Sequence, residues 1–240
     1  MSDIKIYSFD KCPFAQRTRM ALIEKELDFE LIEIDVYNKP DWFLEISPYG
    51  KVPVLVHKGK TIYESAIINE YLEEEYPEVA LMPEDHYERA RARIWIDYAS
   101  NYYLPACSRL IRDHQDEELQ QQNLKIVGDR LLYIEKECFD KNDSGVFWMG
   151  EQLTLVDLHY APFFERFGAY EHLFDAKWPK ECRKIRSWWD AMQDRKSYLE
   201  TFLPTESHIA TYSNMMQRLA SYSVLNASIG SIWAADLAGR

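Results

Sequence analysis

Cysteine, positive charge and long apolar segments are all scarce in this chain of 240 residues. The few thiols are scattered, without the paired spacing of a metal site, so we expect no bound metal. Lysine and arginine number 28 against 40 acidic residues, and a net charge of −12 argues against nucleic-acid binding, which needs positive charge to neutralise phosphates. No apolar stretch approaches the roughly 20 residues of a membrane-spanning helix. The four cysteines are Cys12, Cys107, Cys138 and Cys182.

The N-terminal segment also lacks the apolar core of a secretion signal, because Asp3, Lys5 and Asp10 interrupt it. We therefore expect a soluble, cytoplasmic protein that makes no contact with membranes and keeps its thiols reduced. Three cysteines have the pattern of small core residues. Cys12 has a different context, and most of the functional interpretation depends on it.

Strand-like and helix-like patterns alternate through the first 80 residues. The order is β-α-β-α-β-β-α. The first two strands are joined across a helix, which predicts a parallel pair, and Lys58-Gly59 predicts a hairpin between the last two. This arrangement is thioredoxin-like. The predicted strands are residues 4–9, 29–34, 52–57 and 61–63, and the predicted helices are 17–27, a short one from 40, and 65–76, with Pro13 suited to the first helical turn.

The rest of the chain has helical periodicity after a segment with two prolines. We predict an α/β domain at residues 1–78, a linker at 79–86 and an all-helical domain at 87–240. Pro105 is expected to kink or end the first of these helices. The predicted helices are residues 86–104, a stripe from 124 to 138, one opened by a capping box from Thr154 to Asp157, and residues 180–194 and 207–225.

The junction of the first strand and helix holds Cys12-Pro13-Phe14-Ala15. A thiol at a helix N-terminus faces unpaired N–H groups and the positive end of the helix dipole, which predicts a pKa lowered from about 8.5 into the range of about 3.5–7.5. Arg17 and Arg19 would add to this effect if they face the sulfur. Ala15 replaces a second cysteine, so an oxidised Cys12 needs an external thiol, and glutathione is the abundant candidate.

Three further positions in the first domain have both a binding and a structural interpretation. Val52-Pro53 opens the third strand, and a cis bond there would turn the Val52 backbone toward the thiol. Ser65, as the N-cap of the last helix, offers N–H groups to a carboxylate, and Glu64 offers an acceptor to an ammonium group. Lys39 suits a second carboxylate. Taken singly, Ser65 also fits a plain helix cap and Lys39 a surface lysine.

Together these segments resemble the Omega class of glutathione transferases. The similarity covers the whole first domain at matching spacing and continues more loosely through the helical domain. The segments are residues 12–19 (CPFAQRTR), 38–42 (NKPDW), 52–55 (VPVL), 63–66 (YESA) and 153–157 (LTLVD). Beyond Leu203 we find no match for the residues lining the family's second-substrate pocket among Tyr212, Tyr222 and Trp233.

The resemblance implies a fold, a co-substrate and a set of residue roles. The fold is a thioredoxin-like domain followed by a helical domain, and the co-substrate is glutathione, which forms a mixed disulfide with Cys12. Lys39 would hold the glycyl carboxylate, the Val52 backbone before cis-Pro53 would pair with the cysteinyl backbone, and Glu64 with Ser65 would hold the γ-glutamyl end. Dehydroascorbate reduction, deglutathionylation and a homodimer are implied as well.

Other readings remain open. Tyr7, at the end of the first strand, or a backbone donor would activate glutathione sulfur for conjugation to an electrophile without Cys12. A non-enzymatic regulatory protein of the same fold is the third reading, although the charged helix from Arg17 to Lys25 argues against a channel-like relative. His159 lies near Asp157 without further ligands and is expected to be an ordinary helix residue.

Overall fold

The computed structural model describes residues 3–142 and 144–226, with the side chains of 222–226 left aside. Its N-terminal part is a small mixed sheet with helices, in the predicted order. The elements are β1 (Ile4–Ser8), α1 (Pro13–Glu24), β2 (Glu30–Glu33), α2 (Asp41–Ile46), β3 (Val54–His57), β4 (Lys60–Tyr63) and α3 (Ser65–Glu75). This is the thioredoxin-like arrangement that the sequence predicts.

The sheet has the strand order β2-β1-β3-β4. β1 and β2 are parallel, with Ile6 opposite Leu31, and β3 and β4 form the antiparallel hairpin. Lys58 and Gly59 both have positive φ, at 50° and 75°, which is the backbone twist that a two-residue hairpin turn needs. The predicted parallel pair and the predicted hairpin are both confirmed.

The remainder of the described chain is helical. Its elements are α4 (His86–Tyr98), η1 (Ala99–Tyr103), α5 (Leu104–Arg112), α6 (Glu117–Ile134), η2 (Glu135–Phe139), α7 (Leu155–Glu165), α8 (Phe167–Phe174), α9 (Arg183–Gln193), α10 (Lys196–Leu199) and α11 (Thr205–Asn226). The segments η1 and η2 are single π-helical stretches that continue α4 and α6. The domain boundaries at 78 and 87 stay a prediction.

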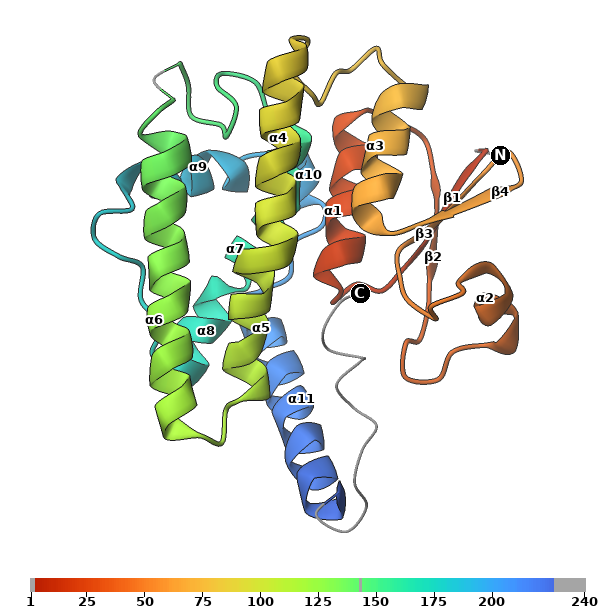
Figure 1. Cartoon of the computed structure of the whole chain (residues 1–240). Coiled ribbons are helices and arrows are strands. Elements are labelled where there is room, and N and C mark those ends of the chain that lie inside the picture. Colours follow the sequence, from red (N-terminus) through yellow and green to blue (C-terminus); the bar gives the residue numbers. More distant parts are fainter. Residues whose placement is uncertain (1–2, 143, 227–240) are drawn as a thin grey trace.

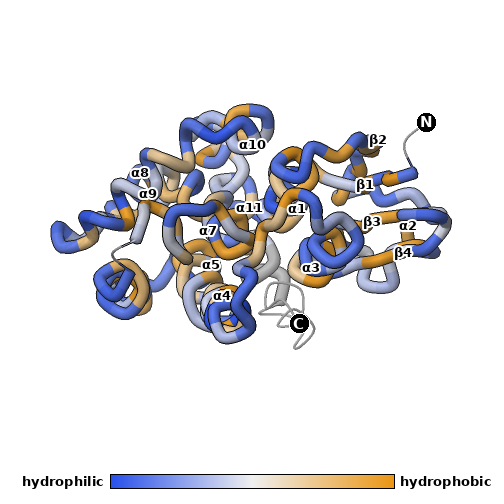
Figure 2. The backbone as a smooth tube through the Cα atoms, turned by 90° about the horizontal axis from the view of Figure 1, so that it is seen from above, coloured by the Kyte–Doolittle hydropathy of each residue, from blue (hydrophilic) through white to orange (hydrophobic). Residues whose placement is uncertain are grey.

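Helix α1 lies at the centre of the molecule, between the sheet and the larger helical part (Figures 1 and 2). It packs against α3 on one side and against α7 and α10 on the other. Eight consecutive residues, 15–22, are buried, and Gln16, Arg17 and Arg19 are among them. Polar side chains in such a position must find partners inside the protein, since burying them unpaired costs about 1–3 kcal/mol each.

Helix α7 is the buried centre of the helical part, and all of its residues are buried. Its predicted capping box is present: the Asp157 carboxylate accepts from the backbone N–H of Thr154 at 2.7 Å. The same carboxylate also accepts from the Trp148 N–H at 3.0 Å and from the Trp188 indole at 2.8 Å. Asp157 therefore fixes the start of α7 and ties two tryptophans of the core to it.

Several local expectations are corrected. Helix α1 begins at Pro13 rather than at residue 17, and Pro105 does not end a helix but lies in the first turn of α5, where its missing N–H is tolerated. The N-cap of α3 is Glu64, so Ser65 is its first helical residue. Trp233 and the side chain of Tyr222 lie outside the described residues. None of the helices in the described part of the chain is long and apolar enough to cross a membrane.

Candidate active site

Cys12 is the N-cap of α1, in extended backbone geometry with φ −84° and ψ 116°. Its N–H donates to the Phe9 carbonyl at 3.0 Å, and its own carbonyl accepts from Gln16 at 2.9 Å, so the residue closes a turn and opens the helix. The Val52–Pro53 peptide bond is cis, as the sequence predicted. The Cys12 thiol, partly exposed, donates to the Val52 carbonyl at 3.8 Å. The structure therefore brings Cys12 and Val52 together.

The pKa of Cys12 departs from the sequence-based expectation. The predicted stabilising groups are present, because the N–H groups of Phe14 and Ala15 and the charges of Arg17 and Arg166 all lower the pKa of the thiol. Burial acts in the opposite direction and is the largest effect, so the pKa is raised from the ordinary value of 9.0. The prediction of a lowered pKa in the free protein was wrong because a sequence pattern shows the helix terminus but not the loss of water around the sulfur.

Arg17 connects two halves of the site. Its Nε donates to the Ser65 hydroxyl at 2.8 Å, and its Nη1 bonds Nε2 of His159 on α7. Burial, followed by the charge of Arg17, lowers the pKa of His159 well below 6.5, so the neutral ring accepts the proton of the guanidinium. Burial also lowers the pKa of Arg17 to about 9, and nearby Cys12 and Glu64 oppose that shift. His159 is therefore more than the ordinary helix residue that the sequence predicted.

Glu64 and Lys39 lie at the exposed rim of the site. Glu64 is exposed and has φ 68° with ψ 108°, a conformation that L-residues rarely adopt and that clusters at functional sites. Lys39 is exposed in the loop before α2. Its ammonium group lies over Gly50, where an added Cβ would come within 3.5 Å of Nζ. Gly50 has φ +61°, so its lack of a side chain both permits the turn and leaves room for the lysine.

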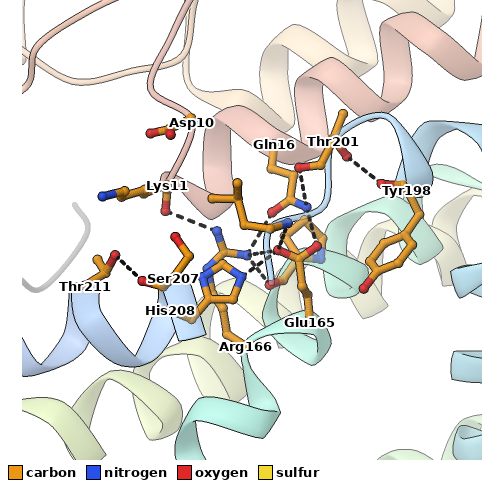
Figure 3. Close-up of polar contacts among 12 residues, drawn as sticks. Asp10, Lys11, Gln16, Glu165, Arg166, Tyr198, Thr201, Ser207, His208 and Thr211 are labelled. Carbon is orange, nitrogen blue, oxygen red and sulfur yellow. Dashed lines mark hydrogen bonds and ion pairs between the residues drawn. The ribbon is translucent and has the colours of Figure 1, made fainter. Parts of the chain in front are cut away.

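A second buried polar group, which the sequence analysis missed, lies on the other side of Cys12 (Figure 3). Arg166, 1% exposed, donates to the Gln16 side chain at 2.8 Å and to the Lys11 carbonyl at 3.1 Å. Glu165 accepts from Gln16 at 2.7 Å and binds His208 of α11 at 2.7 Å. The sequence signal was available in the Glu165-Arg166 pair at the end of an otherwise apolar helix.

Aromatic side chains line the approaches to Cys12. Phe14, 39% exposed, meets Phe163 of α7 edge to face at 5.6 Å. On the other side, Phe9 contacts Tyr37 at 6.0 Å, and the guanidinium of Arg218 from α11 lies 4.3 Å from the Tyr37 ring centre. Helix α11 thus contacts the loop after β2 as well as the Glu165 group.

Tyr7 occupies a different environment. Its ring packs against Trp42 at 5.8 Å and Phe43 at 6.2 Å, both on α2, and belongs to a small apolar cluster with Val54. These contacts favour a packing role for Tyr7. Among the described residues, no group of three or more histidine, cysteine, aspartate or glutamate side chains is arranged to hold a metal ion.

Comparison with known proteins extends this picture. Residues 6–80 match the family model described as the N-terminal domain of glutathione S-transferase. Glutathione S-transferase U28 of Arabidopsis thaliana is 34% identical over 85% of this chain and 91% of its own length. Glutathione S-transferase omega-1 of Mus musculus is 36% identical over 79% of this chain and 76% of its own length. The Omega resemblance is thus supported, and relatives of another type match equally well.

The solved structures give the same result. Glutathione transferase Omega 3C from Trametes versicolor superposes with a TM-score of 0.81 at 30% identity, over 92% of this chain and 93% of that one. A rice Tau-type structure, OsGSTU1 in complex with glutathione, superposes with a TM-score of 0.82 at 28% identity, over 90% of this chain and 97% of that one. Both the sheet domain and the helical domain are therefore shared with these proteins.

Proposed function

The chain belongs to the glutathione S-transferase family, and from that premise we propose that it is a thiol transferase of the Omega type, acting through a mixed disulfide between Cys12 and glutathione. The observation that carries the proposal is the placement of one thiol at the N-cap of α1, against the Val52 carbonyl, with Ala15 where a second thiol would have to stand. Such a site exchanges disulfides with an external thiol and does not form an internal one.

The reaction has two exchange steps. In the first, the Cys12 thiolate attacks the glutathionyl sulfur of a mixed disulfide, the new Cys12–glutathione disulfide forms, and the substrate leaves as a thiolate that takes up a proton. In the second, the thiolate of another glutathione attacks the glutathionyl sulfur on Cys12, which releases oxidised glutathione and regenerates the Cys12 thiolate. Because the Cys12 proton is held toward the Val52 carbonyl, it must leave before the first step.

The remaining predicted residues act as the glutathione site in this proposal. Val52 before cis-Pro53 pairs with the cysteinyl backbone, and Ser65 and Glu64 hold the γ-glutamyl end. Lys39 holds the glycyl carboxylate from the rim. Support comes from geometry: Ser65 is fixed by Arg17, and Glu64 has the strained backbone. Dehydroascorbate reduction and deglutathionylation belong to the proposal, as do the homodimer and the cytoplasmic location.

The test compares wild type with Cys12→Ala in glutathione-dependent reduction of hydroxyethyl disulfide and of dehydroascorbate. Cys182→Ala, which removes a buried thiol of α9's N-cap, is the matched control. We expect activity in wild type and control and none in Cys12→Ala. A glutathionyl adduct on Cys12, seen by mass spectrometry after reaction with oxidised glutathione, would locate the intermediate.

Conjugation is the competing activity. If Cys12→Ala still binds glutathione and conjugates it to an aromatic halide at the wild-type rate, Cys12 is not the reacting centre. Tyr7→Phe then tests whether the phenol activates the sulfur. If neither wild type nor variant binds glutathione in a calorimetric titration, both enzymatic proposals fail and the non-enzymatic reading replaces them.

A further inference from the structure

We propose that Arg166 is a positioning residue for Cys12: its guanidinium, held by Glu165, grips the turn on both sides of the thiol and places a positive charge beside the sulfur. The inference rests on the proposed function only in taking Cys12 as the reacting thiol. It assigns a role in the small site to a residue of the helical domain, more than 150 positions away in the sequence.

The contacts of Arg166 bracket Cys12. Nη2 donates to the carbonyl of Lys11, immediately before the cysteine, and Nη1 donates to the side chain of Gln16, one helical turn after it. The carbonyl of Pro162 accepts a third bond at 2.5 Å. The planar fork of an arginine makes such divergent bonds at fixed angles, which a lysine ammonium on a flexible stem does not reproduce.

The position of Arg166 is itself fixed from behind. The Glu165 carboxylate lies 3.5 Å from the Arg166 guanidinium and accepts a bond from Gln16. The same carboxylate binds His208 and accepts the Leu203 N–H at 3.3 Å. Figure 3 shows the side chains of these elements converging on one point below the Cys12 loop. The start of α11 is thereby connected to the turn that carries the thiol.

Arg166 is one of several charged groups near the sulfur, and its share must be separated from theirs. Arg17 and Arg166 both lower the pKa of Cys12, and Arg19 interacts with it as well. The groups that face these arginines are Asp10 and Glu33 beside Arg19, Glu64 and His159 beside Arg17, and Glu165 with His208 behind Arg166.

Three variants separate a positioning role from a purely structural one. Arg166→Gln removes the charge and the fork, and Arg166→Lys keeps the charge but not the fork. Arg195→Gln is the matched control: Arg195 also joins the helical part to α1, through Glu24, but it is not among the charges that act on Cys12. The readout is the rate of Cys12 alkylation by iodoacetamide between pH 6 and 10, measured on the full chain by mass spectrometry, beside the thermal midpoint of each protein.

For Arg166→Gln we expect alkylation at neutral pH to slow by a factor of about three to ten, with the pH profile displaced to higher pH, because the thiolate fraction falls tenfold for each pKa unit. Arg166→Lys should recover most of the alkylation profile yet remain slower than wild type in disulfide exchange, since the turn is no longer gripped. Arg195→Gln should lower the thermal midpoint and leave the alkylation profile unchanged.

Two results would overturn the proposal. One is an alkylation profile of Arg166→Gln that coincides with wild type in a protein that folds. The other is an equal displacement in Arg195→Gln, which would show that any loss of contact between the domains moves the profile. If Arg166→Gln fails to fold, Arg166→Lys with an unchanged exchange rate overturns it instead. Alkylation needs no glutathione, so failure of the proposed function leaves this readout intact.

Discussion

The side chain of Arg17 donates to the hydroxyl of Ser65 at 2.8 Å, and this single bond joins α1 to the first turn of α3. On its other side the same guanidinium bonds His159, so the site is anchored to the helical part. Both partners are buried, Ser65 at 3% and His159 at 1% exposure. The orientation of Ser65 therefore depends on a residue that belongs neither to α3 nor to any predicted glutathione contact.

Arg17→Met tests this dependence. The variant leaves the Ser65 hydroxyl and the His159 ring without their buried donor, and loss of such a bond costs about 1–3 kcal/mol. We expect glutathione to bind roughly tenfold more weakly by titration calorimetry, with kcat changed less than KM. Arg93→Met, which removes an exposed ion pair with Glu70 between α4 and α3, is the control and should bind glutathione as wild type does. Equal affinity in Arg17→Met and wild type would contradict the role.

Asp157 makes a prediction about pH. Burial raises the pKa of its carboxyl group from 3.8 to about 6, against the opposing hydrogen bonds from Trp148, Thr154 and Trp188. The folded state therefore holds the proton more tightly than the unfolded state, and the stability associated with it is complete below about pH 4 and lost as pH rises through 6.

In Asp157→Asn this titration is absent, and the amide turns N–H groups toward existing donors. We expect the variant to be less stable at every pH. Its deficit in the free energy of unfolding should grow by about 2 kcal/mol between pH 7 and pH 4.5, because wild type alone gains stability there from this group. Urea denaturation at several pH values measures the difference, and a deficit independent of pH would refute the expectation.

Lys25 and Glu73 form a buried ion pair at 2.7 Å, with side chains 0% and 4% exposed. Lys25 also donates to the carbonyls of Tyr76 and Val79, so the pair fastens the chain that leaves α3. Lys25→Met strands a buried carboxylate and should lower the free energy of unfolding by about 3–5 kcal/mol. Lys125→Met removes an exposed pair with Asp129 and should have a far smaller effect in the same urea experiment. Similar losses in both variants would contradict this account.

Two glycines predict opposite effects of the same substitution. A Cβ at Gly145 would lie 2.3 Å from the Gly150 carbonyl oxygen, a backbone atom that cannot move without breaking the loop. Gly128, within α6, has nothing within 4 Å of the added atom. We expect Gly145→Ala to lower the thermal midpoint, and Gly128→Ala to raise stability by about 0.5–1 kcal/mol. Calorimetric scans of both variants decide, and a stabilised Gly145→Ala would contradict the close approach.

Much of the fold was determined by local sequence. Alternating apolar residues and the Lys58-Gly59 turn specified the strands and the hairpin, and Pro13 after Cys12 specified the start of α1. The capping box at Thr154 and Asp157 marked the buried helix correctly. These signals act within one or two turns of the chain, so they survive without knowledge of the tertiary structure.

The sequence by itself also brought Cys12, Val52-Pro53 and Glu64-Ser65 into one hypothesis, because each sits at the end of a predicted element. Only the tertiary structure decided how the thiol behaves there. Burial raises its pKa against the effect of the helix terminus, and the distant Arg166 and His159 supply or relay charge through contacts that span about 150 residues. Desolvation and long-range pairing depend on which surfaces meet, and no local pattern of residues records that.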